Sequence, residues 1–349
     1  MATIFNILLF VLILGVIVFI HEFGHFIFAK IFGVYVYEFA LGMGPKLFSK
    51  KGKETEYTLR AIPIGGFCQL AGEDLDDDDK KKVPAERRLQ AKPWYQRLLI
   101  MFFGAGNNFI SAILILFFIA LIWGGMTMNP IISSVEENYP AYKAGLKSGD
   151  KVVSINKHHI STSDDISLYL AIANPLQKSE IVVERNEKKL TYYVKPAKIA
   201  EGDKEAYRFG ISMRQQKKRG FLNAITYTFQ KTGSLFKQMA VTVSSLFKGK
   251  IKLNQLSGPV GIYSVVGEQS KGGISSLLYL VAFLSINVGF INLLPLPAFD
   301  GGHILFIIIE KIKGSPVSPD LESKIHTIGL ILLMILMVFI TISDIIKLF

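Results

Sequence analysis

The sequence predicts a polytopic α-helical membrane protein with about four transmembrane helices and a soluble α+β domain inserted between the second and third. Half of the 349 residues are hydrophobic, and the apolar residues gather into four long blocks. Charged residues make up only 19% of the chain, whereas an ordinary soluble protein has about 25%. The one long segment with the mixed texture of a soluble domain lies between the second and third apolar blocks.

Each apolar block has the length of a membrane span. A transmembrane helix needs about 20 predominantly apolar residues. The segments that meet or approach this length are Ile4–Phe32, Leu98–Trp123, about Ile274–Phe299 and about Ile328–Ile342. We do not expect the first block to be a signal peptide, because it has no basic n-region and no small-residue cleavage site and its apolar stretch is too long.

The basic residues of the loops predict the orientation. Thirteen lysines and arginines lie from Lys30 to Arg97, and the residues ahead of the first block carry none. The short loop after the third block is also basic, with Lys311, Lys313 and Lys324. Because cytoplasmic loops are enriched in Lys and Arg, we expect both termini and residues 124–273 on the outer side.

The net charge and the cysteine content exclude several classes of partner and site. The net charge is +11, but the basic residues lie mostly beside apolar blocks. We therefore expect a lipid bilayer and no nucleic acid as the partner of this charge. Cys68 is the single cysteine, so the chain has no intrachain disulfide and no cysteine-rich zinc site.

The blocks and the segments between them divide the chain into seven regions. They are a first transmembrane helix at 1–33, a loop region at 34–97, a second transmembrane helix at 98–125, the inserted domain at 126–214, an amphipathic membrane-surface region at 215–273, a third transmembrane helix with a following helix at 274–314, and a fourth transmembrane helix at 325–349. Within 215–250 apolar residues alternate with Lys and Gln. This pattern favours a basic helix on the outer membrane surface, with packing against the inserted domain as the alternative. The acidic run 76–79 predicts a solvated loop.

The inserted domain carries short apolar strands and one helical stretch. The expected strands are Lys151–Ile155, Ile181–Glu184 and Leu190–Val194, and the helix covers about Asp164–Ala173. The run from Ala144 to Asn156 resembles the A-G-L-x-x-G-D-x-I-x-x-I-N signature of bacterial PDZ domains. PDZ domains bind extended peptides by adding a strand to a sheet edge.

The strongest chemical signal lies inside the first apolar block. Residues His21 to His25 read His-Glu-Phe-Gly-His, which is the HExxH pattern. On a helix the two imidazoles share one face and can bind a single Zn²⁺, while Glu22 serves as general base. Ionisable residues inside a membrane span are costly and indicate function. The sequence therefore predicts a metalloprotease site below the cytoplasmic surface.

A catalytic zinc site usually has three protein ligands, so a third ligand is expected in another span. Asp300 qualifies, because it follows a Pro-x-Pro run in the third block. Two prolines at this spacing prevent a regular helix, and irregular backbone at membrane depth is tolerated only where protein or water lines it. His303 is the rival, and the residues alone leave both alternatives open.

Together these motifs resemble the site-2 protease family of intramembrane zinc metalloproteases over almost the whole chain. The likeness rests on HExxH in the first span, the N-x-x-P-x-P-x-x-D-G run of Asn292–Gly301 and the PDZ-like segment between them. Two positions depart from the family pattern: Phe299 replaces the usual Leu before Asp-Gly, and Gly104–Phe109 replaces the usual G-P-x-x-N-F. A single PDZ domain is more like the Gram-positive branch.

The resemblance implies roles for individual residues. It implies that Asp300, and not His303, completes the zinc site, and that Asn292 holds the substrate or the oxyanion. The segment Tyr37–Leu70 resembles a membrane-reentrant β-loop that pairs with the extended substrate. Further substrate-binding positions implied by the matched motifs are Pro295, Pro297, Gly42, Gly44, Gly65, Gly66 and Asn108.

The resemblance also implies the reaction and its setting. It indicates a zinc endopeptidase of the bacterial inner (plasma) membrane that cuts transmembrane segments of single-span proteins, such as anti-sigma factors or remnant signal peptides. An upstream site-1-type protease is expected to trim these substrates first. Two alternatives from other classes are a transporter with a polar midplane site and a PDZ-bearing membrane scaffold in which HExxH is accidental.

Overall fold

The computed structural model describes residues 2–73, 83–201, 204–213, 215–251, 253 and 256–347. The acidic run at 76–79 lies outside these residues. The chain divides into two units, one made of Met1–Ile115 with Leu253–Phe349 and the other of Leu116–Lys252. The first unit holds the predicted metal ligands, and the second holds the predicted inserted domain.

Helices long and apolar enough to cross a membrane lie at Thr3–Ile31, Trp94–Gly124, Ile274–Asn292 and Asp320–Ile346. They belong to helices α1 (Ala2–Ile31), α2 (Trp94–Ile119) with the π-helical turn η4 (Ala120–Gly124), α7 (Ile274–Asn292) and α9 (Pro319–Ile346). The four expected spans are therefore present, and the chain is a polytopic membrane protein.

The fourth helix begins earlier than predicted. α9 starts at Pro319, six residues before the expected 325, because Ser318 caps its N-terminus and accepts a hydrogen bond from the Leu321 amide. The third helix ends earlier than its apolar block, at Asn292, where the Pro-x-Pro run begins an irregular turn. The helix α8 (Asp300–Lys313) follows this turn.

The predicted amphipathic region contains two helices that belong to different units. α5 (Phe221–Phe247) lies in the second unit, and α6 (Pro259–Lys271) lies in the first. Pro259 occupies the favoured first position of α6. Asp344 of α9 accepts hydrogen bonds from the amides of Gly258 and Gly261, which satisfies donors at the start of α6.

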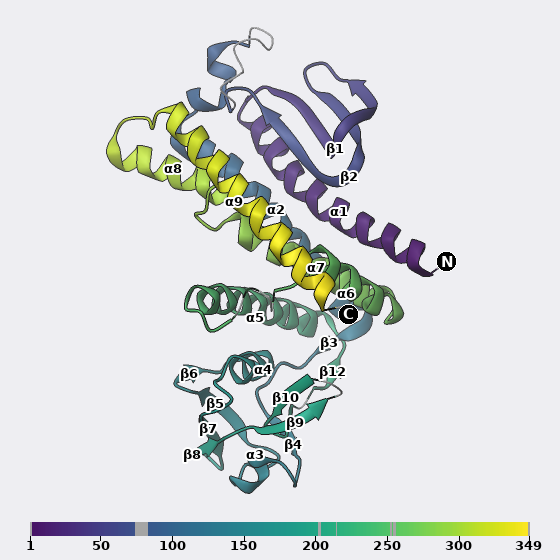
Figure 1. Cartoon of the computed structure of the whole chain (residues 1–349), viewed down its shortest axis with the longest axis vertical. Helices are drawn as coiled ribbons and strands as arrows, with labels where there is room; N and C mark the ends of the chain where they lie inside the picture. The colour runs from purple at the N-terminus through teal and green to yellow at the C-terminus, as the bar shows by residue number, and fades with distance from the viewer. Residues whose placement is uncertain are drawn as a thin grey trace. The chain divides into compact units, whose positions relative to one another are not determined.

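The loop region folds into two long antiparallel strands, β1 (Val36–Lys51) and β2 (Glu56–Leu70), which lie beside α1 (Figure 1). Residues 38–41 of β1 pair twice, with 66–69 and with 56–59 of β2, and residues 46–51 pair with 56–60. The segments are therefore ordered 66–70, 36–41, 56–60, 46–51 across the sheet. No other described strand pairs with the outer edge of 66–70.

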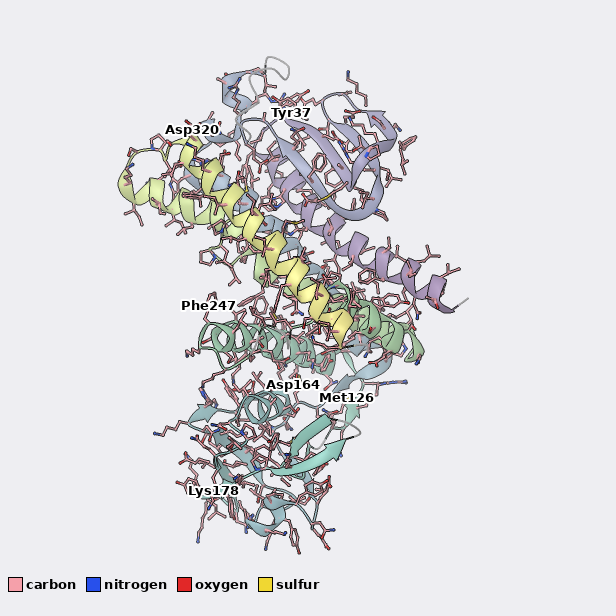
Figure 2. The ribbon with its side chains drawn as sticks, in the orientation of Figure 1. Tyr37, Met126, Asp164, Lys178, Phe247 and Asp320 are labelled. Carbon is pink, nitrogen blue, oxygen red and sulfur yellow. The ribbon has the colours of Figure 1, made fainter. Side chains whose placement is uncertain are left out.

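Charged contacts attach the turn of this sheet to the end of α1. Glu54 accepts hydrogen bonds from Arg87 at 2.7 and 3.0 Å and from Lys30 at 3.0 Å. The Arg87 guanidinium, followed by Lys30, lowers the pKa of the Glu54 carboxyl to about 2. Arg87 belongs to the 3-10 turn η2 (Ala85–Arg87), which is followed by η3 (Leu89–Ala91). Figure 2 labels Tyr37, the second residue of β1, and Asp320, the second residue of α9.

The second unit is rich in β structure. Its main sheet has the order β6-β5-β7-β8, and β5 occupies the predicted range Lys151–Ile155. Its elements are β3 (Gly125–Met126), β4 (Ile132–Val135), α3 (Pro140–Lys143), β6 (His158–His159), α4 (Ser163–Ala171), β7 (Ser179–Arg185), β8 (Lys188–Val194), β9 (Ala197–Glu201), β10 (Lys204–Arg208), β11 (Ile211–Met213) and β12 (Lys217–Lys218). A single buried core joins the sheet to α4 (Figure 1).

The long helix α5 packs against α4 within this unit. Lys231 pairs with Asp164 at 2.7 Å, and Lys237 pairs with the buried Asp165 at 3.0 Å. Asp164 is labelled in Figure 2 at the start of α4. The alternative expected from the sequence, packing of this helix on the inserted domain, is therefore present. Aromatic and aliphatic side chains elsewhere on α5 remain exposed, namely Phe221, Leu222, Phe229 and Phe247.

Candidate metal centre

Three ligand-type side chains meet in the first unit. His21 and His25 lie one turn apart on α1, and Asp300 is the first residue of α8. The two histidine Nε2 atoms are 3.3 Å apart, and the Asp300 oxygens lie 3.2 Å from His21 Nε2 and 3.5 Å from His25 Nε2. Both histidines are only 8% exposed. The structure therefore brings two imidazoles and one carboxylate to a single buried point.

Two glycines allow the helices to meet closely at this point. A Cβ atom on Gly104 of α2 would lie 2.2 Å from His25 Nε2, and a Cβ on Gly24 of α1 would lie 1.9 Å from the Phe103 carbonyl oxygen. Small residues at a crossing let two helix backbones approach. The Gly at the fourth position of HExxH therefore has a packing role that the motif itself does not require.

The irregular turn after α7 presents Asp300. Ala298 adopts a left-handed conformation with φ of 72°, which is uncommon for a residue with a side chain. Cβ atoms on Gly301 or Gly302 would lie 2.1 Å from the Leu294 carbonyl oxygen or 2.6 Å from that of Leu296. The two glycines thus let the first turn of α8 pack on the turn before it, and the Asp300 carboxylate is favoured at a helix N-terminus.

The hydrogen bonds of His25 suit a metal ligand. His25 Nδ1 donates to the Ile100 carbonyl oxygen at 2.9 Å, which leaves the lone pair of Nε2 directed at His21 and Asp300. Metal-bound histidines usually donate their other ring N–H to such a carbonyl. The backbone of α2 therefore sets the tautomer that binding through Nε2 requires.

Asn108 lies beside Nδ1 of His21, as the Ile100 carbonyl lies beside Nδ1 of His25. Its side chain is fully buried, and its amide lies 3.4 Å from His21 Nδ1. The Asn108 oxygen has no hydrogen-bond partner in the described structure. Because amide oxygen and nitrogen are assigned by their surroundings, turning the amide lets this oxygen accept from His21 Nδ1–H and leaves Nε2 free as a ligand.

These distances fit a zinc ion. Tetrahedral zinc with bonds of about 2.0–2.2 Å separates its ligand atoms by about 3.3–3.6 Å, and the three separations here are 3.2, 3.3 and 3.5 Å. Oδ2 of Asp300 also makes no hydrogen bond, although it is buried. Two imidazoles and one carboxylate are a ligand set that catalytic zinc uses. The residues present therefore fit this metal.

A cavity of about 460 Å³ adjoins the three ligands. Glu22 lines it together with both histidines, Asp300 and the segment 67–70 of β2. A Cβ on Gly66 would lie 2.8 Å from the Ala40 carbonyl oxygen and 3.2 Å from Val18 Cγ1 of α1, so glycine lets the edge of the sheet approach α1. Burial raises the pKa of the Cys68 thiol in this wall. A protonated thiol is a poor nucleophile, so Cys68 is not suited to covalent catalysis.

The remaining expected substrate-binding residues lie in different surroundings. Asn292, Pro295 and Pro297 precede Asp300 in the chain but do not line the described part of the cavity. Asn108 contacts His21, and Gly66 faces Glu22. The other three glycines have positive φ angles within β1 and β2: Gly42, Gly44 and Gly65. His303, the rival third ligand, borders the cavity but donates through Nδ1 to Glu322 of α9 at 3.1 Å.

Several groups around the site were not predicted. Cys68, Glu73 and Met101 line the cavity, and the Ile100 carbonyl holds His25. A carbonyl acceptor carries no side-chain signal, and the wall residues come from segments distant in sequence. The small residues at 104–106 were the one signal of a close helix crossing.

The chain was compared with known proteins. A family model described as Peptidase family M50 matches residues 9–336. A Bacillus licheniformis protein named zinc metalloprotease RasP is 32% identical, covering 89% of this chain and 92% of the relative. The Bacillus subtilis regulator of sigma-W protease RasP is also 32% identical, covering 89% and 91%. A putative zinc metalloprotease of Clostridium perfringens is 38% identical, covering 89% and 90%.

The close approach at Gly104 gives a test of the site geometry. Gly104→Ala is expected to lower the zinc content of the purified protein, because the new Cβ would lie 2.2 Å from His25 Nε2. Metal analysis by mass spectrometry measures this. Gly15→Ala in α1, where an added Cβ meets no atom within 4 Å, is the matched control. Full zinc content in Gly104→Ala would contradict the described crossing.

Proposed function

Because the chain belongs to Peptidase family M50 and is a zinc metalloprotease, we propose that it hydrolyses peptide bonds within the transmembrane segments of single-span proteins. The observation that carries this proposal is the position of HExxH. His21 and His25 lie on α1, a helix apolar and long enough to span a membrane, and meet Asp300 beside an open cavity. Such a site is reached most directly from within the bilayer.

In the proposed site, His21, His25 and Asp300 hold the zinc ion. A bound zinc ion supplies Lewis-acid chemistry, which polarises a carbonyl and lowers the pKa of a water molecule to near 7. Glu22, one residue after His21, takes the proton from the attacking water and returns it to the leaving amine. Asn108 and the Ile100 carbonyl keep the two imidazoles in the required orientation. The reaction is peptide-bond hydrolysis, with water as the only co-reactant.

The sheet edge at 66–70 is the proposed docking site for the substrate backbone. A transmembrane helix hides its amides in internal hydrogen bonds, so it must unwind before it is cut. The unwound segment then needs new partners, and a free strand edge provides them. The segment 66–70 has such an edge and also lines the cavity beside Glu22. Gly42, Gly44 and Gly65 bend the rest of the sheet, and Gly66 brings this edge to α1.

The β1–β2 segment and α5 are the proposed membrane-associated parts outside the spans. Apolar side chains of β1 and β2 are exposed, namely Met43, Leu47, Phe48, Leu59 and Ile62. Exposed apolar groups in such numbers are typical of a membrane or protein contact. Lysines flank α5 and its exposed aromatic residues, as in helices on membrane surfaces.

Asn292 remains the proposed donor to the oxyanion, with Pro295 and Pro297 shaping the turn near the substrate.

The second unit is the proposed PDZ domain, and it is proposed to select substrates. One similar protein is named a regulator of sigma-W protease, which supports membrane-bound regulators such as anti-sigma factors as one substrate class. A folded domain on the outer side of the membrane would exclude substrates that still carry a bulky outer domain. An upstream site-1-type protease must then remove that domain first.

The proposed location is the bacterial inner membrane, with both termini and the second unit outside. The support is the distribution of charge. Lys and Arg gather between Lys30 and Arg97 and at the end of α8, and the residues before the first span carry none. The metal site then lies nearer to the cytoplasmic end of α1.

The ligand and base assignments are tested by two neutral substitutions. Glu22→Gln is expected to keep about one zinc per chain and to lose proteolysis, because it removes the base and leaves the ligands. Asp300→Asn is expected to weaken both. Metal analysis and cleavage of a purified single-span substrate measure the outcome. Full activity in Asp300→Asn, together with zinc loss in His303→Ala, would contradict the ligand assignment.

The orientation is tested by cysteine labelling in cells. Ser49→Cys and Glu86→Cys are expected to react with a membrane-impermeant maleimide only after permeabilisation, because their segments lie on the cytoplasmic side. Lys188→Cys is expected to react in intact cells. The wild-type chain, whose single Cys68 is buried, gives the background. Labelling of Glu86→Cys in intact cells would reverse the proposed topology.

The filtering role is tested by removing residues 130–213. β3 and β12 pair on either side of this segment, and the Thr127 amide donates to the Gln216 carbonyl at 2.8 Å, so a short Gly-Ser linker can join the cut ends. A size filter predicts that the shortened protease cuts an untrimmed single-span substrate in cells. Capture of a new C-terminus predicts slower cutting of the trimmed form instead. Intact untrimmed substrate beside efficient cutting of the trimmed form would contradict both roles.

A further inference from the structure

One face of α9 touches the chain on both sides of Asp300. Glu322, His326 and Gly329 are spaced by four and three residues, so they lie on the same face of the helix. Their partners are His303, three residues after Asp300, and the turn Pro297–Ala298 just before it. No sequence motif indicated a role for any of these three α9 residues.

The side chain of His326 binds the backbone of the turn at Ala298. The Ala298 amide donates to His326 Nδ1 at 3.1 Å, across 28 residues of sequence. Ala298 has a φ of 72°, a conformation that costs a residue with a side chain of order 1 kcal/mol or more. Strained backbone of this kind persists only where its surroundings hold it. Among the residues that the structure describes, His326 is the hydrogen-bond acceptor for this amide.

Gly329 and Glu322, on either side of His326 along α9, contact Pro297 and His303. A Cβ on Gly329 would lie 2.2 Å from Pro297 Cβ and 2.9 Å from its carbonyl carbon, so α9 lies directly against the turn. Glu322 accepts a hydrogen bond from His303 Nδ1 at 3.1 Å. The His303 and His326 rings stack with centroids 3.9 Å apart and planes 16° from parallel. The start of α8 and the turn before it are therefore both attached to α9.

His303, Glu322 and His326 are all residue types that bind metal ions, and their ligand atoms lie within 4.8 Å of one another. They are therefore candidates for a second metal site. Their hydrogen bonds favour another role. Because His326 Nδ1 accepts from the Ala298 amide, the neutral ring carries its proton on Nε2 and has no lone pair left for a metal. A metal-bound histidine has the reverse arrangement, in which the second ring nitrogen donates.

We propose that His326 and Gly329 are positioning residues for Asp300, fixing the turn that places its carboxylate against His21 and His25. The inference rests on the proposed role of Asp300 as a zinc ligand. Within the irregular segment 293–299, the Leu296 and Phe299 amides donate to the Leu294 and Leu296 carbonyls at 2.7 and 3.4 Å, which are turn hydrogen bonds and not a helical ladder. α9 adds one hydrogen bond and one close backbone contact to this turn. The expected consequence is a loss of zinc affinity when either contact is removed.

The experiment measures zinc affinity by competition with a chelator, using the full chain purified in detergent, so that the readout does not depend on proteolysis. His326→Leu removes the acceptor, and Gly329→Ala pushes the turn away. Each is expected to weaken zinc binding by about tenfold or more, as outer contacts of metal sites do. His326→Asn keeps an acceptor atom at the Nδ1 position and is expected to bind close to wild type. Ile328→Ala, at an exposed neighbour on α9, is the matched control.

Each contrary result overturns a stated part of the inference. Wild-type zinc affinity in both His326→Leu and Gly329→Ala overturns the positioning role. Equal weakening in Ile328→Ala, or no recovery in His326→Asn, shows general damage to α9 and also overturns it. Two zinc ions in the wild type, with one lost in His326→Leu, would make His326 a ligand instead. Asp300→Asn distinguishes a failure of the positioning role from a failure of the proposed ligand role of Asp300. Unchanged zinc affinity in Asp300→Asn would contradict the ligand role and, with it, this inference.

Discussion

Burial of two imidazoles and a carboxylate at one point in an apolar helical protein is the constraint on which the rest of the first unit depends. The ligand atoms lie 3.2 to 3.5 Å apart, and polar groups at such a site are costly unless they are paired or bind a metal. A zinc ion satisfies all three at once. The helices must then approach closely, which accounts for Gly24 and Gly104 at the crossing of α1 and α2. The Ile100 carbonyl fixes the His25 tautomer for the same reason.

The proposed third ligand has a different structural problem from the first two. His21 and His25 need only a regular helix, whose period puts them on one face. Asp300 lies on a different helix, at the start of α8 after an irregular turn. That turn directs Asp300 to the site, and a carboxylate is stable at a helix N-terminus. We infer that His326 and Gly329 of α9 help to hold the backbone of this turn, although α9 contributes no ligand.

Local patterns predicted the spans, the HExxH helix and strands such as Lys151–Ile155, because each depends on the period or length of a short segment. The choice between Asp300 and His303 came from the family resemblance and not from the residues. The early start of α9, the double pairing of residues 38–41 and the contact of His326 with Ala298 were not predicted. The start of α9 depends on the Ser318 cap, which lies outside the apolar block. The other two contacts depend on partners distant in the sequence. The likeness to the M50 family identifies the chain as a zinc metalloprotease, but it does not indicate these contacts.

Proteolysis inside a membrane requires an acceptor for the backbone that the substrate exposes when it unwinds. Unpaired amides cost several kcal/mol in hydrocarbon, so an unwound helix with no new partner would refold before water reached it. The edge at 66–70 meets this need in the proposed function, since it borders the same cavity as Glu22. Gly66 lets the sheet lie close to α1, because a side chain there would meet both the Ala40 carbonyl oxygen and the Val18 side chain. The edge and the base are therefore held together by the contact of β2 with α1, so a chain added at that edge would pass directly beside the zinc ligands.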